Sequence, residues 1–287
     1  MIRSFARGAN YHTHTSLCDG AEEPENYAKA AIDLNFASLG YSAHAPLPFF
    51  CKWTLRRENL ETYKQLINQL KDKFAGEIEI YCGLEMDYIP DLWPRLKEDI
   101  KPETLDYTIG SIHFIDSFPD GRRWTIDGGN AEFAIGWKEI FDKDSHAVVT
   151  KYFEYTRQMV HEMKPTIVGH IDKIKMQCTE HCFIPDADAV FRKELLYTLE
   201  DIKNTDCIVE INTRGMYRRN EPDFYPGTWA IQQMAKMNIP VAINSDSHRP
   251  EELNKLHDKA RKTLFDAGYR TFKTLYKGEW VDTSLVE

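Results

Sequence analysis

Two pairs of side chains that could bind a metal ion lie near opposite ends of this 287-residue chain. His12 and His14 flank a threonine, and Asp246 and His248 flank a serine. Side chains alternate in an extended segment, so the members of each pair point to the same side and could share one ion. A single His-x-His motif is weak evidence, and the second pair makes a metal site a much stronger interpretation.

Five more potential ligands accompany other apolar runs of the sequence. Four of them stand where such a run stops: His44, Glu85, His113 and His170. The fifth, Asp19, lies five residues beyond His14 and could turn back as a further oxygen ligand. Barrel enzymes build their active sites at the carboxyl ends of the strands, from residues of different loops. So many ligands at strand ends favour one metal centre over separate buried histidines.

The elements that must position these ligands follow an alternating pattern. Seven short apolar runs are predicted strands, at residues 9–13, 38–42, 78–83, 107–112, 166–169, 207–212 and 240–244. Longer stretches between them have helical period: one helix is expected to begin at Pro24, and apolar stripes mark 58–74 and 190–204. This order is typical of βα units around a parallel sheet, so we expect an α/β barrel with helices outside.

Two segments depart from this rhythm. Residues 114–145 form a long insertion rich in aromatic side chains, which is either a surface excursion with its own small core or a lid that shapes a pocket. Residues 271–282 predict a terminal hairpin that turns at Lys277 and Gly278. Neither an internal repeat nor a flexible linker interrupts the chain, so one domain over residues 1–287 is the simplest expectation.

The number and type of ligands indicate the chemistry. A catalytic site for one metal normally uses three protein ligands and a water, so nine candidates imply two or three ions. Imidazole mixed with carboxylate suits zinc, manganese or iron. Two such ions about 3.5–4 Å apart can lower the pKa of a bridging water and polarise a phosphoryl oxygen. We therefore expect phosphoester hydrolysis, by attack of the resulting hydroxide.

Composition limits the partners. Lys and Arg number 36 against 45 Asp and Glu, and this net charge of −9 argues against general nucleic-acid binding. The sequence has no apolar run near the roughly 20 residues that span a membrane. Its first residues lack the apolar stretch of a signal peptide. We expect a cytoplasmic protein that acts on a small molecule.

Six strings around the candidate ligands carry a family resemblance. They are His12-Thr-His14, Ser42-Ala-His44-Ala-Pro46, Gly83-Leu-Glu85-Met-Asp87, Gly110-Ser-Ile-His113-Phe114, Gly169-His170-Ile-Asp172 and Asp246-Ser-His248. In type and order they resemble the PHP (polymerase and histidinol phosphatase) family, and most closely its histidinol-phosphatase branch. The resemblance implies a distorted seven-stranded TIM-like barrel that holds three metal ions.

The same resemblance divides the nine ligands among the three ions. The first ion would be bound by His12, His14, Glu85 and Asp246. The second would share Glu85 and add His113 and His170. The third would use Asp19, His44 and His248. The implied activity is a zinc-dependent histidinol-phosphatase of histidine biosynthesis, which hydrolyses L-histidinol phosphate to L-histidinol and phosphate.

Cationic groups for the substrate phosphate are sought near the same edge. The sixth predicted strand is the only one that ends without a metal ligand, and Arg214 follows it. Arginine suits bidentate phosphate recognition. Further candidates for substrate binding are Arg218, Arg249 and Lys173. We expect Arg214, Asp246 and His248 to act in catalysis, with Asp246 or a water on the third ion protonating the leaving alcohol.

Two alternatives stay open at this point. A phosphoesterase of the same fold could act on nucleotides or other small phosphate esters. A metal-stabilised module without activity, like those attached to some bacterial polymerases, is less favoured because every metal position holds a ligating residue. Aromatic residues at Phe49, Phe50 and Trp53, with those of the insertion, suit the packing of a small ring.

Overall fold

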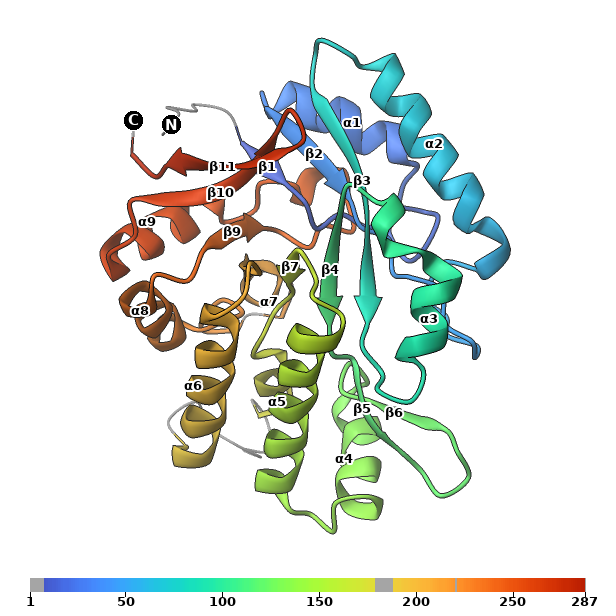
Figure 1. The fold of residues 1–287 in the computed structure, drawn as a ribbon, viewed down its shortest axis with the longest axis vertical. Helices are drawn as coiled ribbons and strands as arrows, with labels where there is room; N and C mark the ends of the chain where they lie inside the picture. The colour runs from blue at the N-terminus through green and yellow to red at the C-terminus, as the bar shows by residue number, and fades with distance from the viewer. Residues whose placement is uncertain (1–7, 179–187, 220, 287) are drawn as a thin grey trace.

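The computed structural model describes residues 8–178, 188–219 and 221–286. A seven-stranded parallel sheet dominates it, in the order β1-β2-β3-β4-β7-β8-β9 (Figure 1). These strands are β1 (Ala9–Asn10), β2 (Ser38–Tyr41), β3 (Glu79–Asp87), β4 (Tyr107–Ser111), β7 (Ile167–Val168), β8 (Ile208–Asn212) and β9 (Val241–Asn244). Past β1 and β9, Thr13 bridges Ser247 in parallel, so the sheet nearly closes. The predicted seven-stranded α/β barrel is confirmed.

Helices surround this sheet. They are α1 (Pro24–Asp33), α2 (Leu60–Lys73), α3 (Trp93–Ile100), α4 (Asn130–Glu139), α5 (Ser145–Glu162), α6 (Ala189–Lys203), α7 (Arg214–Arg219), α8 (Thr228–Met237) and α9 (His257–Ala267). Short 3-10 turns are η1 (Arg57–Asn59), η2 (Pro102–Thr104), η3 (Lys173–Cys178) and η4 (Pro250–Glu252). The three predicted helices correspond to α1, α2 and α6. The apolar stripe of α2 is buried as expected: Leu60, Tyr63, Ile67 and Leu70.

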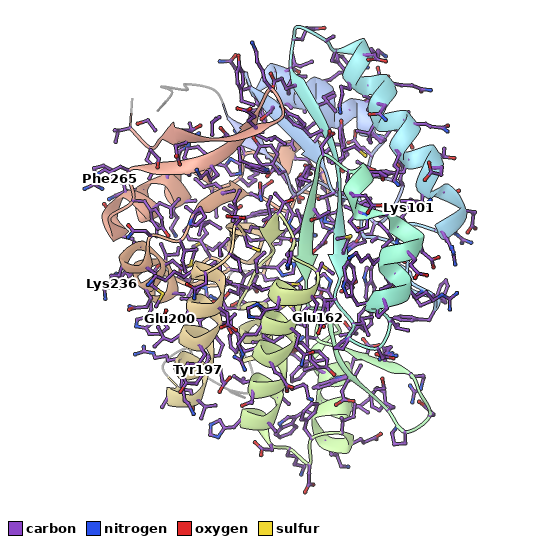
Figure 2. All side chains as sticks on the ribbon, in the orientation of Figure 1. Lys101, Glu162, Tyr197, Glu200, Lys236 and Phe265 are labelled. Atoms are coloured by element: carbon purple, nitrogen blue, oxygen red, sulfur yellow. The ribbon has the colours of Figure 1, made fainter. Side chains whose placement is uncertain are left out.

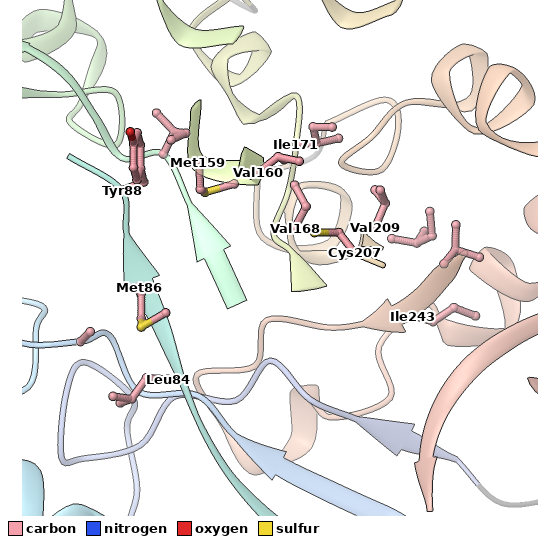
Figure 3. Close-up of a cluster of buried hydrophobic side chains, with 14 of the residues drawn as sticks. Leu84, Met86, Tyr88, Met159, Val160, Val168, Ile171, Cys207, Val209 and Ile243 are labelled. Atoms are coloured by element: carbon pink, nitrogen blue, oxygen red, sulfur yellow. The ribbon is translucent and has the colours of Figure 1, made fainter. Parts of the chain in front are cut away.

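Strand β3 shows how the strands divide apolar from functional side chains. Leu84 and Met86 lie in the apolar layer beneath the helices (Figure 3). Glu85 and Asp87 alternate with them and therefore face the barrel interior. We expected Glu85 to follow a strand ending at residue 83, and this was wrong. The strand continues because residues 83–87 pair in register with β4.

The barrel is closed at its amino end by the C-terminal hairpin. Strands β10 (Thr271–Tyr276) and β11 (Glu279–Ser284) pair antiparallel. Lys277 and Gly278 turn between them with φ of 50° and 78°, the left-handed values that a tight hairpin needs. Trp280 packs on Tyr11 at a ring-centroid distance of 5.0 Å, and Leu275 joins the same buried cluster. The opposite, carboxyl end is left for the ligands.

The insertion after β4 has an apolar core of its own. It contains the hairpin β5 (Phe114–Ser117) and β6 (Arg123–Thr125), followed by α4. Trp124 is buried against Phe133 and Phe141, at ring-centroid distances of 4.9 and 5.4 Å. Figure 1 shows this unit extending past the carboxyl end of β4. It is therefore placed beside the functional edge of the barrel.

Polar side chains cover the outer helices. Figure 2 shows Glu200 on α6 and Lys236 on α8, both exposed, and the exposed aromatic side chains Tyr197 on α6 and Phe265 on α9 are apolar exceptions. Across the described residues, none of the helices combines the length and the apolar character that crossing a bilayer requires.

Candidate metal centre

All nine candidate ligands lie together at the carboxyl end of the barrel. They come from the segments after β1, β2, β4, β7 and β9, and from β3 itself: His12, His14, Asp19, His44, Glu85, His113, His170, Asp246 and His248. Four overlapping groups of them place their nitrogen and oxygen atoms within 4.8 Å of one another. The Thr13–Ser247 bridge joins the two pairs from opposite ends of the chain.

The first group surrounds one oxygen of Glu85. Its Oε2 lies 3.2 Å from His12 Nε2 and 3.5 Å from His14 Nε2. Asp246 Oδ1 lies 3.4 Å from His14 Nε2 and 3.8 Å from His12 Nε2. Separations of this size fit ligands of a single ion with bonds near 2.1 Å.

Glu85 also faces a second group with its other oxygen. Oε1 lies 3.0 Å from His170 Nε2 and 3.7 Å from His113 Nε2. One carboxylate is thus placed between two groups, as a bridging ligand would be. The family resemblance implies that two ions share Glu85, and this sharing stays a prediction.

The third group forms around Asp19. Its Oδ2 lies 3.3 Å from His248 Nε2, and its Oδ1 lies 3.9 Å from His44 Nε2. Gly20 allows this approach, because its amide donates to the carbonyl of Thr15 and a Cβ there would lie 2.3 Å from the carbonyl oxygen of His14. The turn thus carries the Asp19 carboxylate back over the end of the barrel.

The hydrogen bonding of the buried atoms fits metal ions. His12 Nε2, His14 Nε2 and Glu85 Oε2 are buried, face one another and, among the described residues, have no hydrogen-bond partner. His12 Nδ1 donates to Glu210 Oε1 at 2.6 Å, so its Nε2 presents a lone pair toward the group. Buried polar atoms are almost always satisfied, and converging lone pairs are satisfied by a cation. The donor set suits zinc, manganese or iron.

Two carboxylates that orient these histidines were missed from the sequence. Glu210 in β8 is fully buried and holds His12, and Asp87 in β3 accepts from His113 Nδ1 at 2.8 Å. Each fixes the tautomer and leaves Nε2 for a ligand. The signal that could have found them is period two: Glu210 and Asp87 are charged residues within buried strands, and Asp87 stands two residues from Glu85.

Burial and charge keep Glu85, His14 and His44 in the form that binds a metal, whereas His12 is an exception. Despite burial, which opposes ionisation, the surrounding imidazoles, His12 foremost, hold the pKa of Glu85 well below its ordinary value. Burial lowers the pKa of His14 to about 4, and it does the same for His44. Although burial opposes it, Glu210 and the nearby carboxylates raise the pKa of His12 well above its ordinary value. A proton therefore competes with metal at His12.

Asp246 has a strained backbone that its neighbours hold in place. Its φ is +53°, a left-handed value that costs about 1–3 kcal/mol for a residue other than glycine. Arg214 Nη1 donates to the carbonyl oxygen of Asp246 at 2.9 Å, and Tyr217 Oη donates to that of Ser245 at 2.8 Å. Arg214 also lies 3.5 Å from Glu252, a buried carboxylate that was missed from the sequence. The guanidinium is thus fixed beside the ligands.

A cavity of about 1260 Å³ opens above the centre. Of the cations predicted to bind substrate, Arg214 and Lys173 line it, whereas Arg218 and Arg249 are exposed and lie outside its lining. Lys173 Nζ lies 3.2 Å from His113 Nε2. Two of the four predicted cations are therefore in reach of a ligand beside the metal groups.

Aromatic side chains form the outer wall of the same cavity. Trp53 stacks on Phe114 at a ring-centroid distance of 5.9 Å, and Phe49 meets the edge of Phe114 at 5.5 Å. Phe50, also in the lining, is 88% exposed and contributes a free aromatic face. The cavity joins a polar floor to an aromatic wall, which suits a small phosphate ester that carries a ring.

Comparison with known proteins agrees with this architecture. A model of the PHP domain matches residues 10–214. The chain is similar to a Deinococcus radiodurans protein named "Probable histidinol-phosphatase", with 28% identity over 91% of this chain and 94% of that protein. It is 25% identical to the histidinol-phosphatase of Bacillus subtilis, over 86% of this chain and 96% of that protein.

A solved structure shares the fold. It is a histidinol phosphate phosphatase of Lactococcus lactis, described in complex with Zn, L-histidinol and phosphate. Its TM-score to this chain is 0.72 at 21% identity, with 96% of this chain and 99% of that chain covered. Because the domain match includes seven of the nine candidate ligands and spans well over half of the 287 residues, this chain belongs to the PHP domain family.

Proposed function

We propose that this protein is a metal-dependent phosphomonoesterase that hydrolyses L-histidinol phosphate to L-histidinol and inorganic phosphate. The observation that carries the proposal is the convergence of buried nitrogen and oxygen atoms, which lack a hydrogen-bond partner among the described residues, on the floor of a cavity that Arg214 also lines. The names of the relatives from Deinococcus radiodurans and Bacillus subtilis support this choice of substrate.

We assign the nine ligands to three ions in the groups that surround Glu85 and Asp19. The first group is His12, His14, Glu85 and Asp246; the second is Glu85, His113 and His170; the third is Asp19, His44 and His248. Ions bound there supply activation of water and neutralisation of the phosphoryl charge. Zinc is the ion that this donor set favours, with manganese and iron as further candidates.

The chain's own residues would position the reacting groups. The Arg214 guanidinium, held by the carbonyl of Asp246, presents its remaining N–H groups to the phosphoryl oxygens. A water oxygen bonds to phosphorus as the bond from phosphorus to the histidinol oxygen breaks. Asp246, whose Oδ2 accepts from Asn212, takes the proton from the water and returns it to the leaving alcohol. His248, beside Asp246, completes the third group.

The aromatic wall would bind the other end of the substrate. The imidazole ring of L-histidinol phosphate can pack against Phe50 while its phosphate reaches the floor. The net charge of −9 does not favour a nucleic-acid partner. We place the reaction in the cytoplasm.

Phosphate release by the purified, zinc-loaded protein tests the proposal. L-histidinol phosphate is compared with a panel of nucleoside monophosphates and with glycerol phosphate. We expect preferred turnover of L-histidinol phosphate and its loss in the double variant His12→Ala, Asp246→Ala. Cleavage of nucleotides alone would overturn the substrate. Full activity of the double variant would overturn the metal-dependent mechanism.

A further inference from the structure

Asp127, a carboxylate of the insertion, reaches the metal centre. It follows β6, and its Oδ2 lies 3.4 Å from His113 Nε2 and 2.9 Å from Lys173 Nζ. Asp127 and Lys173 both line the cavity. The ligand assignment above uses neither of them, so their contact needs its own explanation.

The loop that carries Asp127 is held firmly. The amide of Ile126 donates to the carbonyl of His113 at 2.8 Å, and the amide of Asp127 donates to Thr125 Oγ1 at 3.0 Å. The side chain of Gln177, itself 2% exposed, donates to the carbonyls on both sides of Asp127. The carboxylate is therefore presented to the cavity by fixed backbone and not by a mobile side chain alone.

Lys173 depends on Asp127 once His113 binds an ion. Within the part of the chain that the structure describes, its ammonium has two neighbours at hydrogen-bond distance, Asp127 Oδ2 and His113 Nε2. His113 Nδ1 is taken by Asp87, so Nε2 is the atom left to ligate. If Nε2 is used as a ligand, it would no longer be open to Lys173, and Asp127 would be the anchor of the ammonium. An ammonium has three N–H donors, so others stay free for a ligand.

We propose that Asp127 is a positioning residue that holds the Lys173 ammonium against the phosphoryl oxygens of the substrate. This inference rests on the proposed function, because it takes phosphate as the group bound at the floor of the cavity. The insertion would thus supply part of the phosphate site. A free lysine side chain loses conformational entropy when it binds a ligand. The ion pair with Asp127 already restricts Lys173, so less entropy is lost when phosphate binds.

The test uses zinc-loaded protein and inorganic phosphate. We expect Asp127→Asn, which keeps the shape and removes the charge, to weaken phosphate binding about tenfold by calorimetry. KM for L-histidinol phosphate should rise by a similar factor with kcat changed less than about twofold, because the contact is equal in ground and transition states. The zinc content should stay that of the wild type. Glu139→Gln is the matched control, since Glu139 belongs to the same insertion, is exposed at the end of α4 and lies outside the cavity lining.

A double-mutant cycle with Lys173→Met separates tethering from independent effects. If Asp127 acts through Lys173, adding Asp127→Asn to Lys173→Met weakens phosphate binding no further. If the double variant binds phosphate more weakly than Lys173→Met alone, by the factor that Asp127→Asn shows in the wild type, the proposal is overturned. A loss of one zinc ion in Asp127→Asn would also overturn it, because Asp127 would then be a metal ligand. Phosphate binding is measured without turnover. A wild type that binds phosphate through this pair and leaves L-histidinol phosphate intact would refute the proposed function and support the positioning role.

Discussion

Replacing Glu210 by glutamine should disable the metal centre through a change of tautomer. Four donors converge on this buried carboxylate: His12 Nδ1 and the Asn244 amide on Oε1, and the backbone amide of His170 and the Asn212 amide on Oε2. Glutamine offers one oxygen and one NH2 group. The backbone amide of His170 cannot turn, so the oxygen must face it and the NH2 group must face His12.

This change at Nδ1 of His12 alters the protonation of Nε2 on the other side of the ring. Its Nδ1 must accept a hydrogen bond instead of donating one, which moves the ring proton to Nε2, the atom that faces Glu85. A protonated Nε2 cannot bind an ion, so we expect zinc affinity to fall about 10–100-fold, as for other changes to residues that orient metal-binding histidines. The Asn244 amide, which loses its acceptor, should cost about 1–3 kcal/mol of unfolding free energy as a buried donor without a partner.

Chelator competition measures the zinc affinity, and urea unfolding of the metal-free protein measures the stability. Glu194→Gln is the control, because Glu194 is also a buried glutamate but pairs with Arg157 between α5 and α6. It should lose stability without losing zinc affinity. Wild-type zinc affinity in Glu210→Gln, or an equal loss in the control, would refute the tautomer argument.

Three further results are expected. Arg214→Lys should raise KM about tenfold in steady-state kinetics, because a lysine cannot donate to the Asp246 carbonyl and also form a bidentate contact with phosphate; an unchanged KM would contradict this. In metal-free protein, against the opposing effect of burial, Asp87 raises the pKa of His113 from 6.5 to about 9. This pKa shift contributes about 3 kcal/mol to the free energy of unfolding, which is complete below pH 6.5 and is lost as the pH rises through 9. The urea midpoint of the metal-free protein should therefore fall between these pH values; a midpoint that does not change with pH would contradict the prediction. Phe50→Ala should raise KM several-fold for L-histidinol phosphate and leave glycerol phosphate unaffected, since Phe50 is 88% exposed in the cavity lining.

The strands and the ligand cluster were predictable because both follow local rules. Alternation places His12 and His14 on one side whatever the rest of the chain does. The carboxyl ends of parallel strands meet at one edge, which brings residues as distant as His44 and His170 together. The end of β3 was misjudged at residue 83 because Glu85, a charged side chain, interrupts the apolar run that marked the strand.

Other features depend on tertiary contacts that no local rule contains. Asp127 belongs to an irregular loop, and its position depends on the hydrogen bonds that Gln177 donates to the neighbouring carbonyls. Arg218 follows Arg214 by one turn of the short helix α7, and both lie near Glu252. Only Arg214 reaches Asp246, whereas Arg218 is exposed to solvent. Spacing alone could not distinguish these two arginines.

The central claim, that the nine ligands hold the ions at which phosphate binds, is tested most directly by diffraction at the zinc absorption edge. Crystals would be grown with zinc and inorganic phosphate. We predict two or three anomalous peaks, with Glu85 between the first two and Asp19 bound to the third, and a phosphate in contact with Arg214. Peaks held by other residues, or a phosphate bound away from the peaks, would contradict the account.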